Sequence, residues 1–252
     1  MHVMSRNLPI DAVLFNLDGT LLHTSPGIGS ALNCALTDHN IPSLSLDLMK
    51  TLIGGGSTLL VERALTLHGF SGWSHTHDKV LRHYEAHYRS VCHGLNGNLM
   101  ALRPGVEATL DDLRQMGIKL GVVTSTERQF ATPLLQRSGL SAWVDLVVDG
   151  DTLAQRKPHA APLLHACEVL AVEPAHTLHV GGSANDAMAA QAAGMPMVCA
   201  SRGYSADHAL PRLQVIDDLD ELPRLIGGPR SWRGSGSVRA PHQQDDSAGL
   251  WN

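Results

Sequence analysis

The chain has 252 residues, and 43% of them are hydrophobic, which supplies enough apolar surface for a folded core and excludes disorder as its main state. Its 19 basic and 24 acidic side chains leave a formal charge of −5, which argues against general nucleic-acid binding through a basic face. No apolar run reaches the roughly 18–20 residues of a membrane-spanning helix, and the first residues lack the pattern of a secretory signal. The 4 cysteines lie far apart without a CxxC pair, so we expect a cytoplasmic protein with reduced thiols.

The apolar pattern predicts alternating strands and helices in most of the chain. A buried strand is expected over residues 11–15, followed by a polar turn over 16–20 and helices over 25–39, 57–68 and 76–91. After residue 104 the expected helices are 105–116, 127–138, 162–170 and 185–193, and the expected strands are 119–123, 146–148, 177–180, 197–200 and 214–216. Strands that alternate with helices of about ten residues are typical of βαβ units and a parallel sheet.

The helical segment interrupts this series directly after its first strand. We therefore predict a doubly wound α/β core of residues 1–23 and 101–226, with an inserted α-helical cap of residues 24–100. Residues 227–252 are rich in glycine, serine and arginine and offer little to bury, which predicts a disordered tail.

Polar residues follow several of the predicted strands. Ligands of open parallel sheets bind at the carboxyl ends of the strands, so these residues are expected to converge on one crevice. They comprise two aspartates, several hydroxyls, a lysine and exposed glycine amides: Asn16, Asp18, Gly19, Thr124, Ser125, Lys157, Gly182 and Asp186. Backbone N–H groups and a lysine surround phosphate oxygens well, which favours a small anionic ligand.

Four stretches resemble the ordered motifs of the haloacid dehalogenase superfamily of phosphohydrolases. They are Phe15-Asn-Leu-Asp-Gly-Thr-Leu-Leu22, Val123-Thr124, Lys157-Pro158 and Val180-Gly-Gly-Ser-Ala-Asn-Asp186. Within that superfamily, the segments that begin at Ile53, Val61, Arg103 and Ala189 resemble the phosphoglycolate phosphatase group. The resemblance covers about residues 10–226 and implies Mg²⁺-dependent hydrolysis of a small phosphorylated metabolite, with 2-phosphoglycolate as the first candidate, through a phosphoaspartate. It implies neither a nucleic-acid nor a membrane partner, and the oligomeric state stays open.

The resemblance also assigns roles to individual positions. Asn16 occupies the position of the nucleophilic aspartate, and Asp18 that of the general acid/base, whose backbone carbonyl also contributes to the metal site. Thr124, together with Ser125 and Gly19, is expected to hold the phosphoryl group, and Lys157 to neutralise its charge. Gly182 occupies a metal-ligand position and Asp186 the position of the supporting carboxylate. On the cap, Gly54, Gly56 and Arg63 are expected to face the substrate.

Two of these positions depart from the family pattern. A neutral carboxamide at Asn16 is a poor nucleophile, and Gly182 has no side chain with which to hold a hard cation. We therefore expect weakened Mg²⁺ binding and strongly impaired or absent hydrolysis, which leaves a phosphoester- or partner-binding protein as the alternative to an enzyme. Conversion of Asn16 to aspartate after synthesis would restore the nucleophile but not the ligand, and an engineered substrate-trapping variant would explain Asn16 alone.

The cap is also rich in histidine. His83 and His87 are four residues apart and share one face of a predicted helix, a spacing that some metal sites use. No acidic residue of a metalloprotease pattern lies between them and no cysteine is near, so a solvated cap surface is the favoured interpretation.

Overall fold

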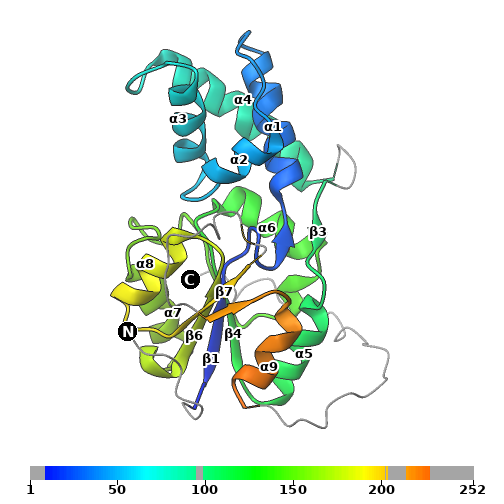
Figure 1. Ribbon diagram of the computed structural model, residues 1–252, viewed down its shortest axis with the longest axis vertical. Coiled ribbons are helices and arrows are strands. Elements are labelled where there is room, and N and C mark those ends of the chain that lie inside the picture. Colours follow the sequence, from blue (N-terminus) through cyan, green and yellow to red (C-terminus); the bar gives the residue numbers. More distant parts are fainter. Residues whose placement is uncertain (1–8, 95–98, 202, 204–213, 228–252) are drawn as a thin grey trace.

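The computed structural model describes residues 9–94, 99–201, 203 and 214–227. Its main sheet has six parallel strands in the order β5-β4-β1-β6-β7-β8 (Figure 1). The strands are β1 (Ala12–Phe15), β4 (Lys119–Val123), β5 (Leu146–Val148), β6 (Thr177–Gly181), β7 (Met197–Ala200) and β8 (Gln214–Ile216). Because β1 lies between β4 and β6, the chain turns to opposite sides of the sheet from this strand, and ligands of such sheets bind at this point.

Helices pack on both faces of this sheet. The side chains of β1 divide between two cores: Val13 and Phe15 join one hydrophobic cluster, and Ala12 and Leu14 join the other. This alternation follows from the two-residue period of a strand. The helices of this part of the molecule are α5 (Val106–Gln115), α6 (Arg128–Arg137), α7 (Ala161–Leu170), α8 (Ala184–Ala192) and α9 (Leu222–Leu225).

Four helices between β2 (Leu22–His23) and β3 (Ala101–Leu102) form a separate group above the sheet in Figure 1. We call them the helical segment: α1 (Ser25–Thr37), α2 (Leu46–Leu52), α3 (Ser57–Leu67) and α4 (His75–Cys92). The antiparallel pair β2–β3 connects the segment to the body that contains the sheet. Buried residues of the segment belong to the same hydrophobic cluster as Val13 and Phe15, so its core is continuous with one face of the sheet.

Side chains of α4 and α6 also join the two parts. The rings of Tyr88 and Phe130 lie 4.9 Å apart between centroids. Arg137 Nη1 donates to the carbonyl oxygen of Cys92 at 2.9 Å, and Arg89 donates to Gln129 Oε1 at 2.5 Å. The helical segment is thus held against the body by both apolar and polar contacts.

The α/β fold with a parallel sheet confirms the sequence prediction of fold class. The expected strands 119–123, 146–148, 197–200 and 214–216 have the observed bounds. Elements that were not expected include α2, the two-residue strands β2 and β3 and the four-residue helix α9. The predicted disordered tail lies outside the described residues except for Gly227.

Candidate functional site

A cavity of about 60 Å³ lies where the carboxyl ends of β1, β4 and β6 meet the helical segment. The sheet end of this pocket is lined by candidates that come after β1, β4, β5 and β6, namely Asn16, Asp18, Thr124, Ser125, Lys157, Gly182 and Asp186. Its opposite end is lined by residues of the helical segment and by the loop after β4, which are Gly54, Gly55, Gly56, Ser57, Tyr84 and Glu127. The structure therefore brings most of the predicted site residues together.

Lys157 is buried at the sheet end of the pocket and is held by three acceptors. Its Nζ donates to Asp186 Oδ1 at 2.6 Å, to the carbonyl oxygen of Val123 at 2.7 Å and to Asn16 Oδ1 at 3.1 Å. Asn16 in turn donates from Nδ2 to the backbone carbonyl oxygen of Asp18 at 3.1 Å. Both polar atoms of the Asn16 amide are thus engaged within the protein.

Asp186 is fully buried and accepts hydrogen bonds on both oxygens. Besides Lys157, His179 Nε2 lies 3.2 Å from Oδ1, and Ser183 donates to Oδ2 from its hydroxyl at 2.6 Å and its backbone N at 3.0 Å. Burial alone would raise the pKa of this carboxyl, but the Lys157 ammonium and His179 hold it well below its usual range. The negative charge of Asp186 is therefore balanced by Lys157, which belongs to the same part of the molecule.

Asp18 is bound by hydroxyl groups. Thr24 donates to Oδ1 at 2.7 Å, and Thr126 donates to Oδ2. Burial raises the pKa of Asp18, and these hydrogen bonds and the charge of Lys157 offset only part of that effect. A carboxyl group with a raised pKa is suited to giving up a proton to a ligand oxygen at moderately acidic pH.

The space beside Gly182 is filled by backbone. A Cβ atom added there would lie 2.5 Å from Gly203 Cα and 3.1 Å from the carbonyl oxygen of Ala200. A side chain at this position therefore requires Gly203 to move.

The groups present do not form a good site for Mg²⁺. This ion prefers six oxygen ligands, usually with one or two carboxylates. The Asp18 carbonyl accepts from the Asn16 amide, both oxygens of Asp186 have donors, and Gly182 offers no side chain. Within the part of the chain that the structure describes, no three His, Cys, Asp or Glu side chains are grouped so that they could hold a metal ion.

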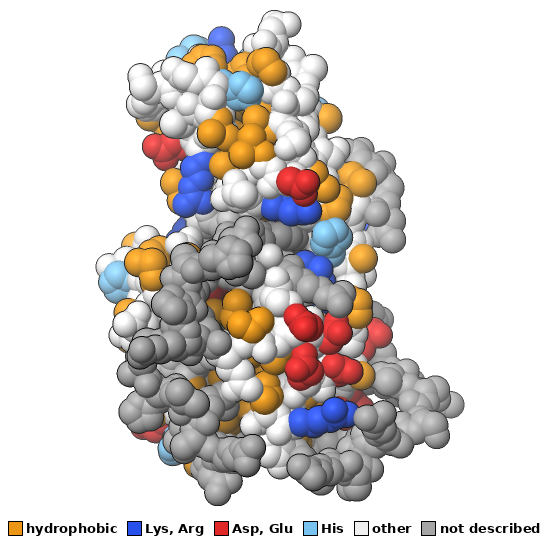
Figure 2. Space-filling view, viewed as in Figure 1, with side chains coloured by type: hydrophobic (Ala, Val, Ile, Leu, Met, Phe, Trp, Pro, Cys, Tyr) orange, Lys and Arg blue, Asp and Glu red, His pale blue; other side chains and the backbone are white. Residues whose placement is uncertain are grey.

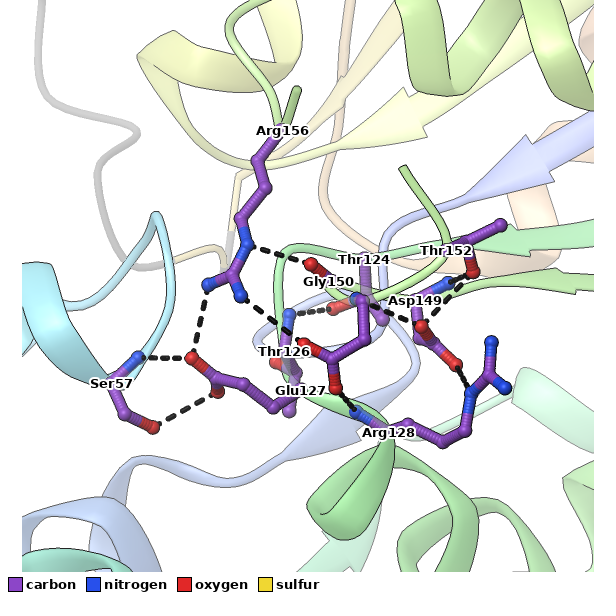
Figure 3. Close-up of polar contacts among 10 residues, drawn as sticks. Ser57, Thr124, Thr126, Glu127, Arg128, Asp149, Gly150, Thr152 and Arg156 are labelled. Carbon is purple, nitrogen blue, oxygen red and sulfur yellow. Dashed lines mark hydrogen bonds and ion pairs between the residues drawn. The ribbon is translucent and has the colours of Figure 1, made fainter. Parts of the chain in front are cut away.

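At the opposite end of the pocket, Glu127 joins the body to the helical segment (Figure 3). Its Oε1 accepts from Ser57 N at 2.9 Å and from Arg156 Nη1 at 3.0 Å, and its Oε2 accepts from Ser57 Oγ at 2.9 Å. Sequence analysis missed all three residues, because Glu127 and Ser57 are 70 positions apart. The glutamate directly after the Thr124–Thr126 stretch was the one available signal.

The remaining predicted residues line the pocket on the side of the helical segment or lie outside the pocket. Gly54 and Gly56 line the pocket as expected. Arg63 instead donates to the carbonyl oxygens of Leu52 at 2.9 Å and Gly54 at 3.0 Å. Its guanidinium therefore supports the loop of Gly54, Gly55 and Gly56, which we call the glycine loop. Gly19 lines a second cavity of about 20 Å³.

The two spaced histidines of α4 contact a single carboxylate. His83 Nδ1 and His87 Nε2 lie 2.9 and 2.8 Å from Asp38 Oδ2. These hydrogen bonds lower the pKa of Asp38, which lies on the exposed surface of the segment. The histidines thus connect α4 to the end of α1.

The fold and the site define an α/β protein of the doubly wound type, with a polar pocket at the switch point of its sheet. Residues 13–200 match the family model of haloacid dehalogenase-like hydrolases. The chain belongs to this family.

Individual relatives point to one group within it. A plasmid-encoded phosphoglycolate phosphatase of Cupriavidus necator is 39% identical over 87% of this chain and 94% of its own length. A phosphoglycolate phosphatase of Thiobacillus denitrificans is 38% identical over 87% of this chain and 96% of its own. The crystal structure of a predicted phosphoglycolate phosphatase from Haemophilus somnus superposes with a TM-score of 0.77 at 28% identity, covering 88% of this chain and 99% of that one. The chain is thus similar to phosphoglycolate phosphatases over nearly its whole described length.

The face drawn in Figure 2 carries charged side chains of both signs. Acidic side chains gather on the body there, while basic side chains are scattered over the helical segment and the body. No helix among the described residues is long and apolar enough to cross a membrane.

Proposed function

We propose that this protein binds a small phosphomonoester in the pocket at the end of β1 and hydrolyses it very slowly or not at all. The observation that carries the proposal is the state of Asn16. Its amide oxygen accepts from Lys157 and its amide nitrogen donates to the Asp18 carbonyl. A neutral amide held in this way has no anionic oxygen with which to attack phosphorus. Loss of one essential member of a catalytic group costs on the order of 10⁴–10⁶ in rate.

Charge balance supports retained ligand binding. Relative to the family pattern, Asn16 and Gly182 remove two carboxylates, and weakened Mg²⁺ binding removes one divalent cation. The net charge of the pocket therefore stays unchanged without a metal, so a phosphate dianion meets no added repulsion. The Thr124 hydroxyl and the backbone amide of Ser125 are the groups that would bind its oxygens, and the Lys157 ammonium supplies positive charge beside them.

The remaining parts of the proposal follow from the relatives and the fold. The named substrate of the phosphoglycolate phosphatases makes 2-phosphoglycolate the reference ligand. The helical segment acts as a cap that closes over the ligand and excludes water. The 4 unpaired cysteines support a location in the reducing cytoplasm.

The test compares phosphate release from 2-phosphoglycolate by three proteins in the presence of Mg²⁺. They are the natural chain, Asn16→Asp and Asn16→Asp/Gly182→Asp. We expect the natural chain to release phosphate at least about 10⁴-fold more slowly than a typical enzyme of this class. Turnover should rise in Asn16→Asp, and it should become Mg²⁺-dependent in the double variant if Gly203 can move. Ordinary turnover by the natural chain would contradict the proposal, provided that mass spectrometry shows Asn16 unconverted.

A further inference from the structure

Glu127 places a negative charge among the residues that line the pocket, on the side of the helical segment. Its side chain is only 11% exposed, and it lines the pocket together with Ser57 and Tyr84. It does not cap the helix α6 that follows it, although it occupies the N-cap position. Its carboxylate points instead at the start of α3 (Figure 3).

Two neighbouring residues already donate hydrogen bonds to this carboxylate. Ser57 donates both its backbone N–H and its hydroxyl to Glu127, and Arg156 donates Nη1. The other guanidinium nitrogens of Arg156 are held by Gly150 O at 2.7 Å and by Asp151 Oδ1 at 3.3 Å. A second carboxylate arriving at this place would therefore meet donors that are already shared with Glu127 and Asp151, and it would lie beside a like charge.

The glycine loop keeps this arrangement compact. A Cβ atom on Gly56 would lie 2.2 Å from Arg156 Nη1 and 2.7 Å from Glu127 Oε1, and the backbone of Gly56 has a φ of +92°. The charge of Glu127 also acts on Tyr84, which lines the same pocket. Burial raises the pKa of Tyr84, and the negative charge of Glu127 raises it further. The loop thus packs closely against a carboxylate that lines the same pocket as Lys157.

We propose that Glu127 determines ligand specificity: it favours phosphomonoesters that carry a hydroxyl group at the end opposite the phosphoryl group over those that carry a carboxylate there. A hydroxyl can donate a hydrogen bond to a remaining lone pair of Glu127, whereas a carboxylate would be repelled or would have to displace Glu127 from its donors. This inference rests on the proposed function, since it assumes that the phosphoryl group binds near Lys157. The inference assigns this chain a preferred ligand other than 2-phosphoglycolate, the substrate for which its relatives are named.

Two ligands test the inference because they differ only at the end in question. 2-Phosphoglycolate carries a carboxylate where 2-hydroxyethyl phosphate carries a CH₂OH group. We would titrate both by calorimetry at pH 7.5 into the natural chain, Glu127→Gln and Glu107→Gln. The amide introduced by Glu127→Gln can still accept from Ser57 N and Arg156 and donate to Ser57 Oγ, so the contact remains while the charge is lost. Glu107 lies exposed in the first turn of α5 and serves as the charge-matched control.

We expect the natural chain to bind 2-hydroxyethyl phosphate at least about tenfold more tightly, which corresponds to about 1.4 kcal/mol. In Glu127→Gln this ratio should fall toward one, and in Glu107→Gln it should stay as in the natural chain. Equal or tighter binding of 2-phosphoglycolate by the natural chain would overturn the inference without the use of any variant, as would an unchanged ratio in Glu127→Gln. If neither ligand bound the natural chain, the proposed function itself would fail, and the inference with it.

Discussion

At the sheet end of the pocket, Lys157 is paired with Asp186 inside the body, whereas at the other end Glu127 pairs with Arg156 and reaches Ser57 in a different part of the chain. The first pair is almost completely buried and fixes positions within one core. The second spans the boundary between the body and the helical segment. The comparison teaches that the charge at the sheet end is balanced within one core, whereas the charge at the other end also joins two parts of the chain.

The largest expected effect comes from breaking the buried pair. Lys157→Met leaves the Asp186 carboxylate buried beside His179 without its main cation, and such a loss destabilises by about 3–5 kcal/mol. Urea unfolding measures this change. Lys157→Met/Asp186→Asn should recover part of it, because both charges are then removed. A double variant as unstable as Lys157→Met would contradict the pairing.

The same pair predicts how stability depends on pH. The pKa of Asp186 is lower in the folded protein than its ordinary value of about 3.9. Its contribution is therefore present above about pH 4 and is lost as the pH falls below that value. Urea unfolding between pH 6 and pH 3 should show a steeper loss for the natural chain than for Lys157→Met/Asp186→Asn. If the free energy of unfolding fell equally with pH in the two proteins, Asp186 would not be the source of the pH dependence.

Gly182 provides the next effect in size. In Gly182→Ala the new Cβ would meet Gly203 Cα at 2.5 Å, and such overpacking costs about 1–3 kcal/mol. Thermal unfolding measures this loss of stability. The control is Ser183→Gly, which removes the hydroxyl contact to Asp186 without adding any atom near Gly203. A Gly182→Ala protein as stable as the natural chain would show that Gly203 yields freely.

The contact at the helical end should be weaker. Ser57→Ala removes the hydroxyl hydrogen bond to Glu127 but keeps the one from the backbone N–H, which predicts a loss of about 0.5–1.5 kcal/mol. Hydrogen exchange should locate the change at the start of α3. Protection lost across the whole sheet instead would contradict a local role for Ser57.

The smallest effect is expected at the exposed histidine pair. Asp38→Asn weakens the contacts with His83 and His87, but solvent screens such pairs, so the free energy of unfolding should change by less than about 1 kcal/mol. Urea unfolding at neutral pH measures it. A change of several kcal/mol would show that these contacts hold α1 and α4 together.

Much of the fold could be predicted because short apolar runs bounded by polar turns define the strands. The sheet end of the pocket could be predicted for a related reason, since Asn16, Thr124 and Gly182 directly follow strand ends that must meet. The helix α2 was missed although Ser45 caps its start by accepting from Leu48 N, because seven residues carry little periodicity. The contact of Glu127 with Ser57 depends on how the helical segment sits on the body, and no local pattern encodes that placement.

The central claim is that the pocket binds a phosphomonoester and leaves it intact. Phosphorus NMR of 2-hydroxyethyl phosphate and 2-phosphoglycolate, each mixed with the natural chain and Mg²⁺, tests binding and cleavage in one sample. We predict a ligand signal that shifts or broadens in proportion to the protein while no inorganic phosphate accumulates over hours. Inorganic phosphate growing past one equivalent of protein within minutes would contradict the claim and would require a nucleophile other than Asn16.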